Sequence, residues 1–286
     1  MRVLITGGAG QLGRDLAEVL GVSAFALDRS DCDVTKPPAV EGAVARVRPD
    51  AIVNAAAWTD VDGCEADPDR ARLVNATGAG NVARAAGDAL VVQISTDYVF
   101  DGYGARPYTE TDATNPLSVY GASKLEGEGQ AVGAARWAIV RSAWLYGAGT
   151  RNFVAAILRA ARTRDRLEVV DDQVGSPTST PDLAAALATL IERGATGVLH
   201  GVNAGQCSRF EFARAIFAEA GLDPSRVEPV ATAAMPRPAV RPGFAALDGF
   251  AWRAAGLPVL RPWREALRDV VPGVLDALDA EAATKR

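Results

Sequence analysis

A glycine-rich turn directly after the first apolar run constrains the fold of this chain more than any other feature. Residues 3–6 are apolar or β-branched, and Gly7, Gly10 and Gly13 then form a G-x-x-G-x-x-G pattern that opens a helical repeat. Glycines at this spacing allow a tight turn and a close approach of backbone to a pyrophosphate. The free N–H groups of a helix N-terminus attract phosphate. The pattern therefore predicts a dinucleotide-binding unit that places these residues beside the cofactor: Gly7, Gly10, Gln11, Leu12 and Gly13.

The first half of the chain alternates short apolar runs with helical spacing. Strands are predicted over residues 3–6, 23–28, 51–54, 89–95 and 137–141. Helices are predicted over residues 11–20, 37–47, 68–87 and 117–131. Strict alternation of this kind predicts parallel strands that are joined by right-handed crossovers. We therefore expect an α/β fold with a Rossmann-type doubly wound parallel sheet.

The pattern loosens after about residue 146. Helices are predicted over residues 152–162, 181–192 and 208–219, the last opened by the capping box Ser208-x-x-Glu211, and a short strand over 167–170. The proline-rich segment 229–242 predicts no regular element, and residues 277–286 predict a frayed tail. We expect residues 1–146 to form the dinucleotide-binding domain. Residues 147–286 should form mainly a small C-terminal α/β substrate-binding lobe, with some segments returning to the Rossmann core.

Composition argues against several classes of function. The 286 residues include 30 Lys and Arg against 35 Asp and Glu, and a net charge of −5 gives no support to nucleic-acid binding. The sequence has neither a long apolar run that could span a membrane nor the pattern of a signal peptide, so we expect a cytoplasmic protein. Three scattered cysteines predict no disulfide framework. His200 is the only histidine, and we expect it to be structural because no metal-ligand cluster surrounds it in the sequence.

Candidate residues for the adenosine end of a dinucleotide follow the second and third predicted strands. Asp28 ends the second strand, where a carboxylate can accept hydrogen bonds from ribose hydroxyls and would favour NADH. Arg29 follows directly and could instead receive the 2′-phosphate of NADPH, so the cofactor preference stays open. Asp33 and Val34 could flank the adenine. Small side chains after the third strand would let the cofactor lie against backbone, and these are Ala55, Ala56 and Ala57.

A tyrosine and a lysine four residues apart form the candidate catalytic pair. Tyr120 and Lys124 would share one face of a helix that we expect to begin at Asn115 as N-cap, with Pro116 as its first residue. An ammonium beside a phenol stabilises the phenolate, and lowering a tyrosine pKa from about 10 to about 7 corresponds to roughly 4 kcal/mol. A phenol with such a pKa is an effective general acid near neutral pH.

Two hydroxyl side chains end the fourth predicted strand. Ser95 and Thr96 are adjacent, and successive side chains of a strand point to opposite faces, so only one of them can face a cleft. The hydroxyl that does so could donate a hydrogen bond to a substrate oxygen and position it. Neither the strand nor its neighbours decide between the two.

These motifs resemble those of the extended short-chain dehydrogenase/reductase family and, within it, the branch of dTDP-4-dehydrorhamnose reductases. Besides the glycine turn and the tyrosine–lysine pair, the resemblance rests on residues 54–62, 95–102, 141–146 and 172–178, which occur in family order. The resemblance implies reduction of the C4 ketone of dTDP-4-dehydro-β-L-rhamnose to dTDP-L-rhamnose, with NADPH or NADH as cofactor and a nucleotide sugar as partner.

The resemblance also implies roles for individual residues. Tyr120 would donate the proton, while Lys124 would hold the nicotinamide ribose and lower the tyrosine pKa. Thr96, rather than Ser95, would be the catalytic hydroxyl. Substrate contacts would come from Thr96 and from three further residues, of which Trp144 would stack on the thymine ring: Asp97, Trp144 and Arg241.

Metal binding and assembly stay open in this comparison. Some relatives bind Mg²⁺ through glutamates at a dimer interface, where this chain offers only Asp15 on its first predicted helix. We therefore assign no metal ligand, and both Mg²⁺ and a homodimer stay open. The run from Arg241 to Ala245 also lacks the serine that relatives often carry there.

Other enzymes of the same fold carry different residues at these motifs. A 4,6-dehydratase would carry a glutamate after Thr-Asp, but Tyr98 follows Thr96 and Asp97 here. A 4-epimerase receives no support from residues 97–101. Two alternatives stay open: a reductase of another nucleotide-linked 4-keto-6-deoxysugar, and a non-catalytic NAD(P)-binding regulatory subunit, although such a subunit would not need Thr96, Tyr120 and Lys124 together.

Overall fold

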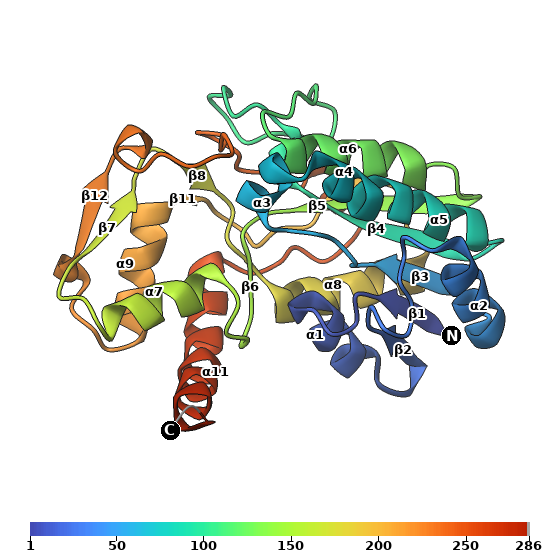
Figure 1. Ribbon diagram of the computed structural model, residues 1–286, viewed down its shortest axis with the longest axis horizontal. Coiled ribbons are helices and arrows are strands. Elements are labelled where there is room, and N and C mark those ends of the chain that lie inside the picture. Colours follow the sequence, from blue (N-terminus) through green and yellow to red (C-terminus); the bar gives the residue numbers. More distant parts are fainter. Residues whose placement is uncertain (285–286) are drawn as a thin grey trace.

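The computed structural model describes residues 1–284 and contains a central parallel sheet of six strands, in the order β10-β5-β4-β3-β1-β2 (Figure 1). The strands are β1 (Val3–Thr6), β2 (Ala24–Leu27), β3 (Ala51–Asn54), β4 (Leu90–Thr96), β5 (Arg136–Ser142) and β10 (Gly197–His200). All five pairings are parallel. This confirms the predicted Rossmann-type α/β sheet. Connections reverse direction between β1 and β3, and in such sheets ligands bind in the crevice outside the carboxyl ends at this point.

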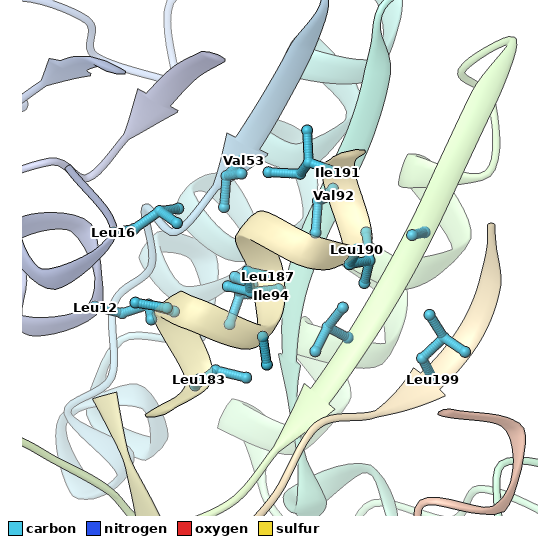
Figure 2. Close-up of a cluster of buried hydrophobic side chains, with 14 of the residues drawn as sticks. Leu12, Leu16, Val53, Val92, Ile94, Leu183, Leu187, Leu190, Ile191 and Leu199 are labelled. Carbon is cyan, nitrogen blue, oxygen red and sulfur yellow. The ribbon is translucent and has the colours of Figure 1, made fainter. Parts of the chain in front are cut away.

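Helices cover both faces of the sheet. On one face lie α1 (Gln11–Leu20) and α8 (Thr180–Arg193), and on the other lie α2 (Pro37–Val47), α5 (Gly78–Ala85) and α6 (Val119–Ala131). Figure 2 shows apolar side chains of α8 pointing toward those of the sheet and of α1. Every residue of β1, β3 and β4 is buried, because helices on both faces exclude water from these strands.

A smaller lobe lies beside the sheet and has an apolar core of its own (Figure 1). Its helices are α7 (Phe153–Ala161), α9 (Arg209–Glu219) and α11 (Trp263–Thr284). Its strands form two pairs, β7 (Leu167–Val170) with β12 (Val227–Val230) and β8 (Val174–Gly175) with β11 (Cys207–Ser208). The core of the lobe is aromatic and includes Tyr146, Phe212, Phe217 and Trp263.

The chain passes repeatedly between the sheet and the lobe. β6 (Leu145–Tyr146) pairs with β9 (Thr178–Ser179) where the chain leaves the lobe, and α8 and β10 then join the sheet. The chain returns to the lobe for β11, α9 and β12. It comes back once more for α10 (Phe250–Ala254), whose Trp252 is buried against the sheet, before α11 closes the lobe.

Two helix predictions in the first half need correction. The predicted helix 68–87 is divided into α4 (Pro68–Arg72), a π-helical turn (Leu73–Thr77) and α5, and the short helix α3 (Val61–Ala66) before it was not predicted. Helix α6 does not begin at Asn115, because the Asn115 amide donates to Asp101 instead of capping a helix. The N-cap is Ser118, whose hydroxyl accepts the Gly121 N–H.

Two predictions in the second half were also wrong. Pro229 lies inside β12, which tolerates a proline because β12 pairs with β7 alone. Residues 277–284 are not a frayed tail but the last turns of α11, where Leu278 is buried and Asp279 pairs with Arg162. The last two residues of that predicted tail, 285–286, lie outside the described part of the chain.

His200 is structural in this fold, as expected. It ends the edge strand β10 and is almost fully buried, with Nδ1 3.1 Å from the Tyr108 carbonyl oxygen and 3.0 Å from that of Asp248. Burial lowers its pKa to about 4, so the ring is neutral. None of the helices within residues 1–284 combines the length and apolar character needed to span a membrane.

Candidate active site

A cleft of about 850 Å³ opens at the carboxyl ends of β1, β3 and β4. The glycine turn, the residues after β3, the end of β4 and α6 all contribute to its walls. A second cavity of about 890 Å³ adjoins it on the side of the smaller lobe. The two cavities share six lining residues, so together they form one extended site: Thr59, Val61, Tyr98, Thr150, Arg151 and Arg209.

The glycine turn forms one end of the cleft with backbone alone. Gly7 has a φ of 71°, and a β-carbon on Gly13 would lie 2.5 Å from the Gly7 carbonyl oxygen. Helix α1 begins after Gly10 without a capping side chain and without an acidic residue in its first turn. Its first N–H groups are therefore free to receive an anion, and the turn leaves room for backbone contact with a pyrophosphate. Gln11 and Leu12 line the same end of the cleft.

Most candidates for the adenosine end do not line the cleft. Asp28 follows β2, and its Oδ1 accepts hydrogen bonds from the Ser30 hydroxyl and backbone, which lower the pKa of this carboxyl. Arg29 is largely exposed and lies 3.6 Å from Asp33. Val34 is buried and packs against helix α5 at Gly78. Among the small residues after β3, Ala55 and Ala57 line the cleft and Ala56 is not in its wall.

The two hydroxyls at the end of β4 have different partners. The Ser95 hydroxyl donates to Glu128, a buried carboxylate of α6. The Thr96 hydroxyl donates to Asp97 Oδ1 at 2.9 Å, and its position beside the Tyr120 phenol lowers the pKa of that tyrosine against the larger effect of burial. Both residues contribute to the cleft wall, but the Ser95 hydroxyl is bonded to Glu128, whereas the Thr96 hydroxyl lies beside the tyrosine.

The tyrosine–lysine pair is buried at the base of the cleft. Burial raises the pKa of Tyr120, whereas the sequence predicted a lowered value. Burial also lowers the pKa of Lys124 to about 8, against the effect of the Glu128 carboxylate. Loss of water disfavours both charged forms, and it outweighs any stabilisation of the phenolate in this state. The Lys124 ammonium donates to the Ile94 carbonyl oxygen at 2.6 Å. The raised pKa keeps the phenol of Tyr120 protonated.

Asp97 and Trp144 line the cleft but not the second cavity. Burial raises the pKa of Asp97 to about 6, and its Oδ2 has no hydrogen-bond partner within residues 1–284. Trp144 has a φ of 47°, in the left-handed region that few non-glycine residues adopt. A β-carbon on Gly175 would lie 2.4 Å from its indole ring, so the ring needs a glycine at that position.

The sequence also matches a family model. Residues 1–275 match the RmlD substrate binding domain. The chain belongs to the RmlD family. A relative from Mycobacterium tuberculosis named dTDP-4-dehydrorhamnose reductase is 49% identical, over 93% of this chain and 91% of its own length. A relative from Streptomyces niveus named dTDP-4-keto-6-deoxy-D-glucose reductase is 42% identical, over 95% of this chain and 96% of its own.

Solved structures of RmlD-family relatives match the whole fold. A dTDP-4-dehydrorhamnose reductase from Clostridium acetobutylicum superposes with a TM-score of 0.92 at 41% identity, covering 95% of this chain and 99% of its own. The enzyme of the same name from Bacillus anthracis, in complex with NADP, superposes with a TM-score of 0.91 at 38% identity. The match covers 94% of this chain and 98% of that one. These likenesses confirm the resemblance that the sequence motifs indicated.

The remaining candidates occupy different places in this RmlD-family fold. Arg241 lines the second cavity, and its guanidinium forms a paired ion contact with Asp62 at 2.9 and 3.0 Å. Asp15 lies between α1 and α8 beside Thr180, and burial raises its pKa. Within the described residues no group of three or more His, Cys, Asp or Glu side chains is arranged to hold a metal ion.

Sequence reasoning missed Arg209, the first residue of α9, which lines both cavities. Its position after the capping residue Ser208 predicts a helix and says nothing about a site. Tyr98 was noted only because it is not a glutamate, yet its ring packs edge-on against Tyr120 with the centroids 5.5 Å apart. Only the tertiary structure brings these two side chains into the cleft that contains the tyrosine–lysine pair.

Proposed function

We propose that this chain uses NADPH or NADH to reduce the C4 ketone of dTDP-4-dehydro-β-L-rhamnose to dTDP-L-rhamnose. The observation that carries the proposal is the placement of Tyr120, Lys124 and Thr96 in the same cleft as a glycine turn suited to a pyrophosphate. Relatives that carry the name dTDP-4-dehydrorhamnose reductase support this choice of substrate.

Each residue of the cleft has a separate role in such a reduction. A bound nicotinamide would supply the hydride for the carbonyl carbon. Tyr120 donates its phenolic proton to the carbonyl oxygen, since burial keeps that proton in place until a negative charge develops nearby. Thr96 orients the same oxygen, and Asp97 offers an unpartnered oxygen to a sugar hydroxyl. Lys124 lies one helical turn from Tyr120, and its positive charge stabilises the phenolate that remains.

A spectrophotometric assay tests this function. The dTDP-4-keto sugar is generated in situ, and consumption of NADPH or NADH is followed at 340 nm in the presence and absence of the protein. We expect oxidation that depends on both the keto sugar and the protein. No oxidation with either cofactor would support a non-catalytic, cofactor-binding subunit instead.

A second reductase activity has support from a named relative. The Streptomyces niveus relative is named dTDP-4-keto-6-deoxy-D-glucose reductase. The keto sugar in that name differs in configuration from dTDP-4-dehydro-β-L-rhamnose. NMR of the product distinguishes the two functions, because it reports the configuration of the ring at C3, C4 and C5. A product other than dTDP-L-rhamnose from a mixed pool of keto sugars would favour this second function.

Substitution of Gly13 tests the role of the glycine turn. The new β-carbon of Gly13→Ala would lie 2.5 Å from the Gly7 carbonyl oxygen and 2.8 Å from the Gly8 α-carbon, so the turn must shift. A misplacement of about one ångström can cost on the order of 100-fold, and we expect affinity for NADPH to fall by about 10- to 100-fold. Fluorescence titration measures this affinity.

Gly42→Ala is the matched control for that substitution. Gly42 lies in α2, where a β-carbon would meet nothing within 4 Å. It should leave NADPH affinity unchanged and add about 1 kcal/mol to the free energy of unfolding. Equal NADPH affinity in the Gly13 and Gly42 variants would contradict a binding role for the turn.

A further inference from the structure

The guanidinium of Arg209 lies at the junction of the two cavities. Its carbon Cζ is 3.5 Å from the centroid of the Trp144 ring and 5.0 Å from that of Phe153. Across residues 1–284 these aromatic rings are the only partners of the guanidinium, which forms neither an ion pair nor a hydrogen bond. Burial lowers the pKa of Arg209, with partial compensation from Tyr98 and Asp97. Arg209 is half-buried, and among residues 1–284 its guanidinium has no carboxylate within ion-pair distance.

Such an arrangement leaves the charge available to an anionic ligand. An indole ring attracts a stacked cation but supplies no counter-charge. Stacking occupies the flat face of a guanidinium and leaves its in-plane N–H groups free. Those N–H groups form a planar fork that matches two oxygens of a phosphate.

Arg241 does not present the same donors. Two of its nitrogens donate to Asp62, and Nη1 also donates to the Ala239 carbonyl oxygen. The charge of Arg241 is therefore already neutralised within the protein. Of these two arginines of the second cavity, only Arg209 retains an unpaired fork.

We infer that Arg209, held flat on the Trp144 ring, donates hydrogen bonds to the diphosphate of the nucleotide sugar. The inference rests on the proposed function. Arg209 lines both the cleft that contains Tyr120 and the cavity beyond it. A sugar ring at Tyr120 and a nucleoside in the second cavity would leave the diphosphate at this junction. Trp144 then supports the arginine, and thymine stacking is not its main role.

Binding measurements with dTDP and thymidine test the inference. Both ligands are titrated into the protein–NADPH complex, dTDP by calorimetry and thymidine by ligand-observed NMR. Because hydrogen bonds to charged groups contribute about 1.5–3 kcal/mol, Arg209→Gln should weaken dTDP binding by about 10- to 100-fold and change thymidine binding less than twofold. Arg209→Lys keeps the positive charge but not the planar arrangement of N–H donors, so its affinity for dTDP should fall several-fold. Trp144→Leu should also weaken dTDP binding more than thymidine binding.

Arg264→Gln is the matched control. Arg264 lies on α11, outside both cavities, with its guanidinium 4.4 Å from the Trp263 ring centroid, and it is exposed. This variant should bind dTDP as the unmodified protein does.

Three results would overturn the inference. One is an unchanged dTDP affinity in both Arg209 variants. Another is an equal loss of affinity for dTDP and for thymidine in Arg209→Gln, which would indicate damage to the site. The third is a selective loss of thymidine affinity in Trp144→Leu, which would indicate that the indole stacks on the thymine ring. If the unmodified protein neither binds dTDP nor oxidises NADPH with the keto sugar, the proposed function itself fails, and the inference fails with it.

Discussion

Tyr120→Phe is expected to lower the rate of ketone reduction by about 10²–10⁴-fold, which is the usual contribution of a general acid. Phenylalanine keeps the edge-on contact with Tyr98 and the burial at the base of the cleft, but it has no proton to donate. Affinity for NADPH should stay nearly unchanged, because the glycine turn is distant in sequence and independent of the hydroxyl. Steady-state assays and NADPH titration measure the two quantities separately.

Tyr103→Phe provides the control for this experiment. Tyr103 is 82% exposed and lines neither cavity, so loss of its hydroxyl should not affect turnover. If Tyr120→Phe turned over substrate at the rate of Tyr103→Phe, the phenol would not be the acid. A large fall in NADPH affinity would instead indicate that the substitution had disturbed the fold of the cleft.

Glu128→Gln is expected to lower the free energy of unfolding by about 3–5 kcal/mol, the range seen when one partner of a buried ion pair is removed. Glu128 and Arg141 are 4% and 5% exposed, and the guanidinium donates to both carboxylate oxygens at 2.9 and 2.7 Å. The amide would leave a buried arginine without a counter-charge and would weaken the bond from Ser95. Urea denaturation measures the loss.

The same helix offers a matched control two residues earlier. Glu126 pairs with Arg72 at 3.0 Å, but the two side chains are 43% and 66% exposed. Because solvent screens such a pair, Glu126→Gln should cost at most about 1 kcal/mol. Similar losses in the two variants would contradict the claim that burial makes the Glu128–Arg141 pair important.

Local sequence patterns were sufficient to predict five of the six strands of the sheet, but not β10, and the glycine turn after β1. β1, α1, α2 and β3 have the predicted bounds, because apolar periodicity and the glycine turn act over a few residues. The tyrosine–lysine pair was predicted for the same reason, since four residues span one turn of α6. These signals need no knowledge of what lies across the fold.

Features that depend on distant contacts could not be predicted in this way. Asn115 has the chemistry of a helix cap, but Asp101 competes for its side chain, and Ser118 caps α6 instead. The raised pKa of Tyr120 depends on how deeply the assembled fold buries the phenol. Arg209 follows an ordinary capping box, and only the packing of α9 brings its guanidinium over Trp144.

The repeated passage of the chain between sheet and lobe limits how such a protein can be recombined. The sheet contains β10, and α8 and α10 pack against it, although all three elements follow the first lobe segment in sequence. Helix α11 follows all of them but packs in the lobe. Neither half is an uninterrupted piece of sequence. A chimaera that takes its lobe from a relative must therefore be spliced at several junctions. A single crossover would build both the sheet and the lobe from segments of both parent proteins.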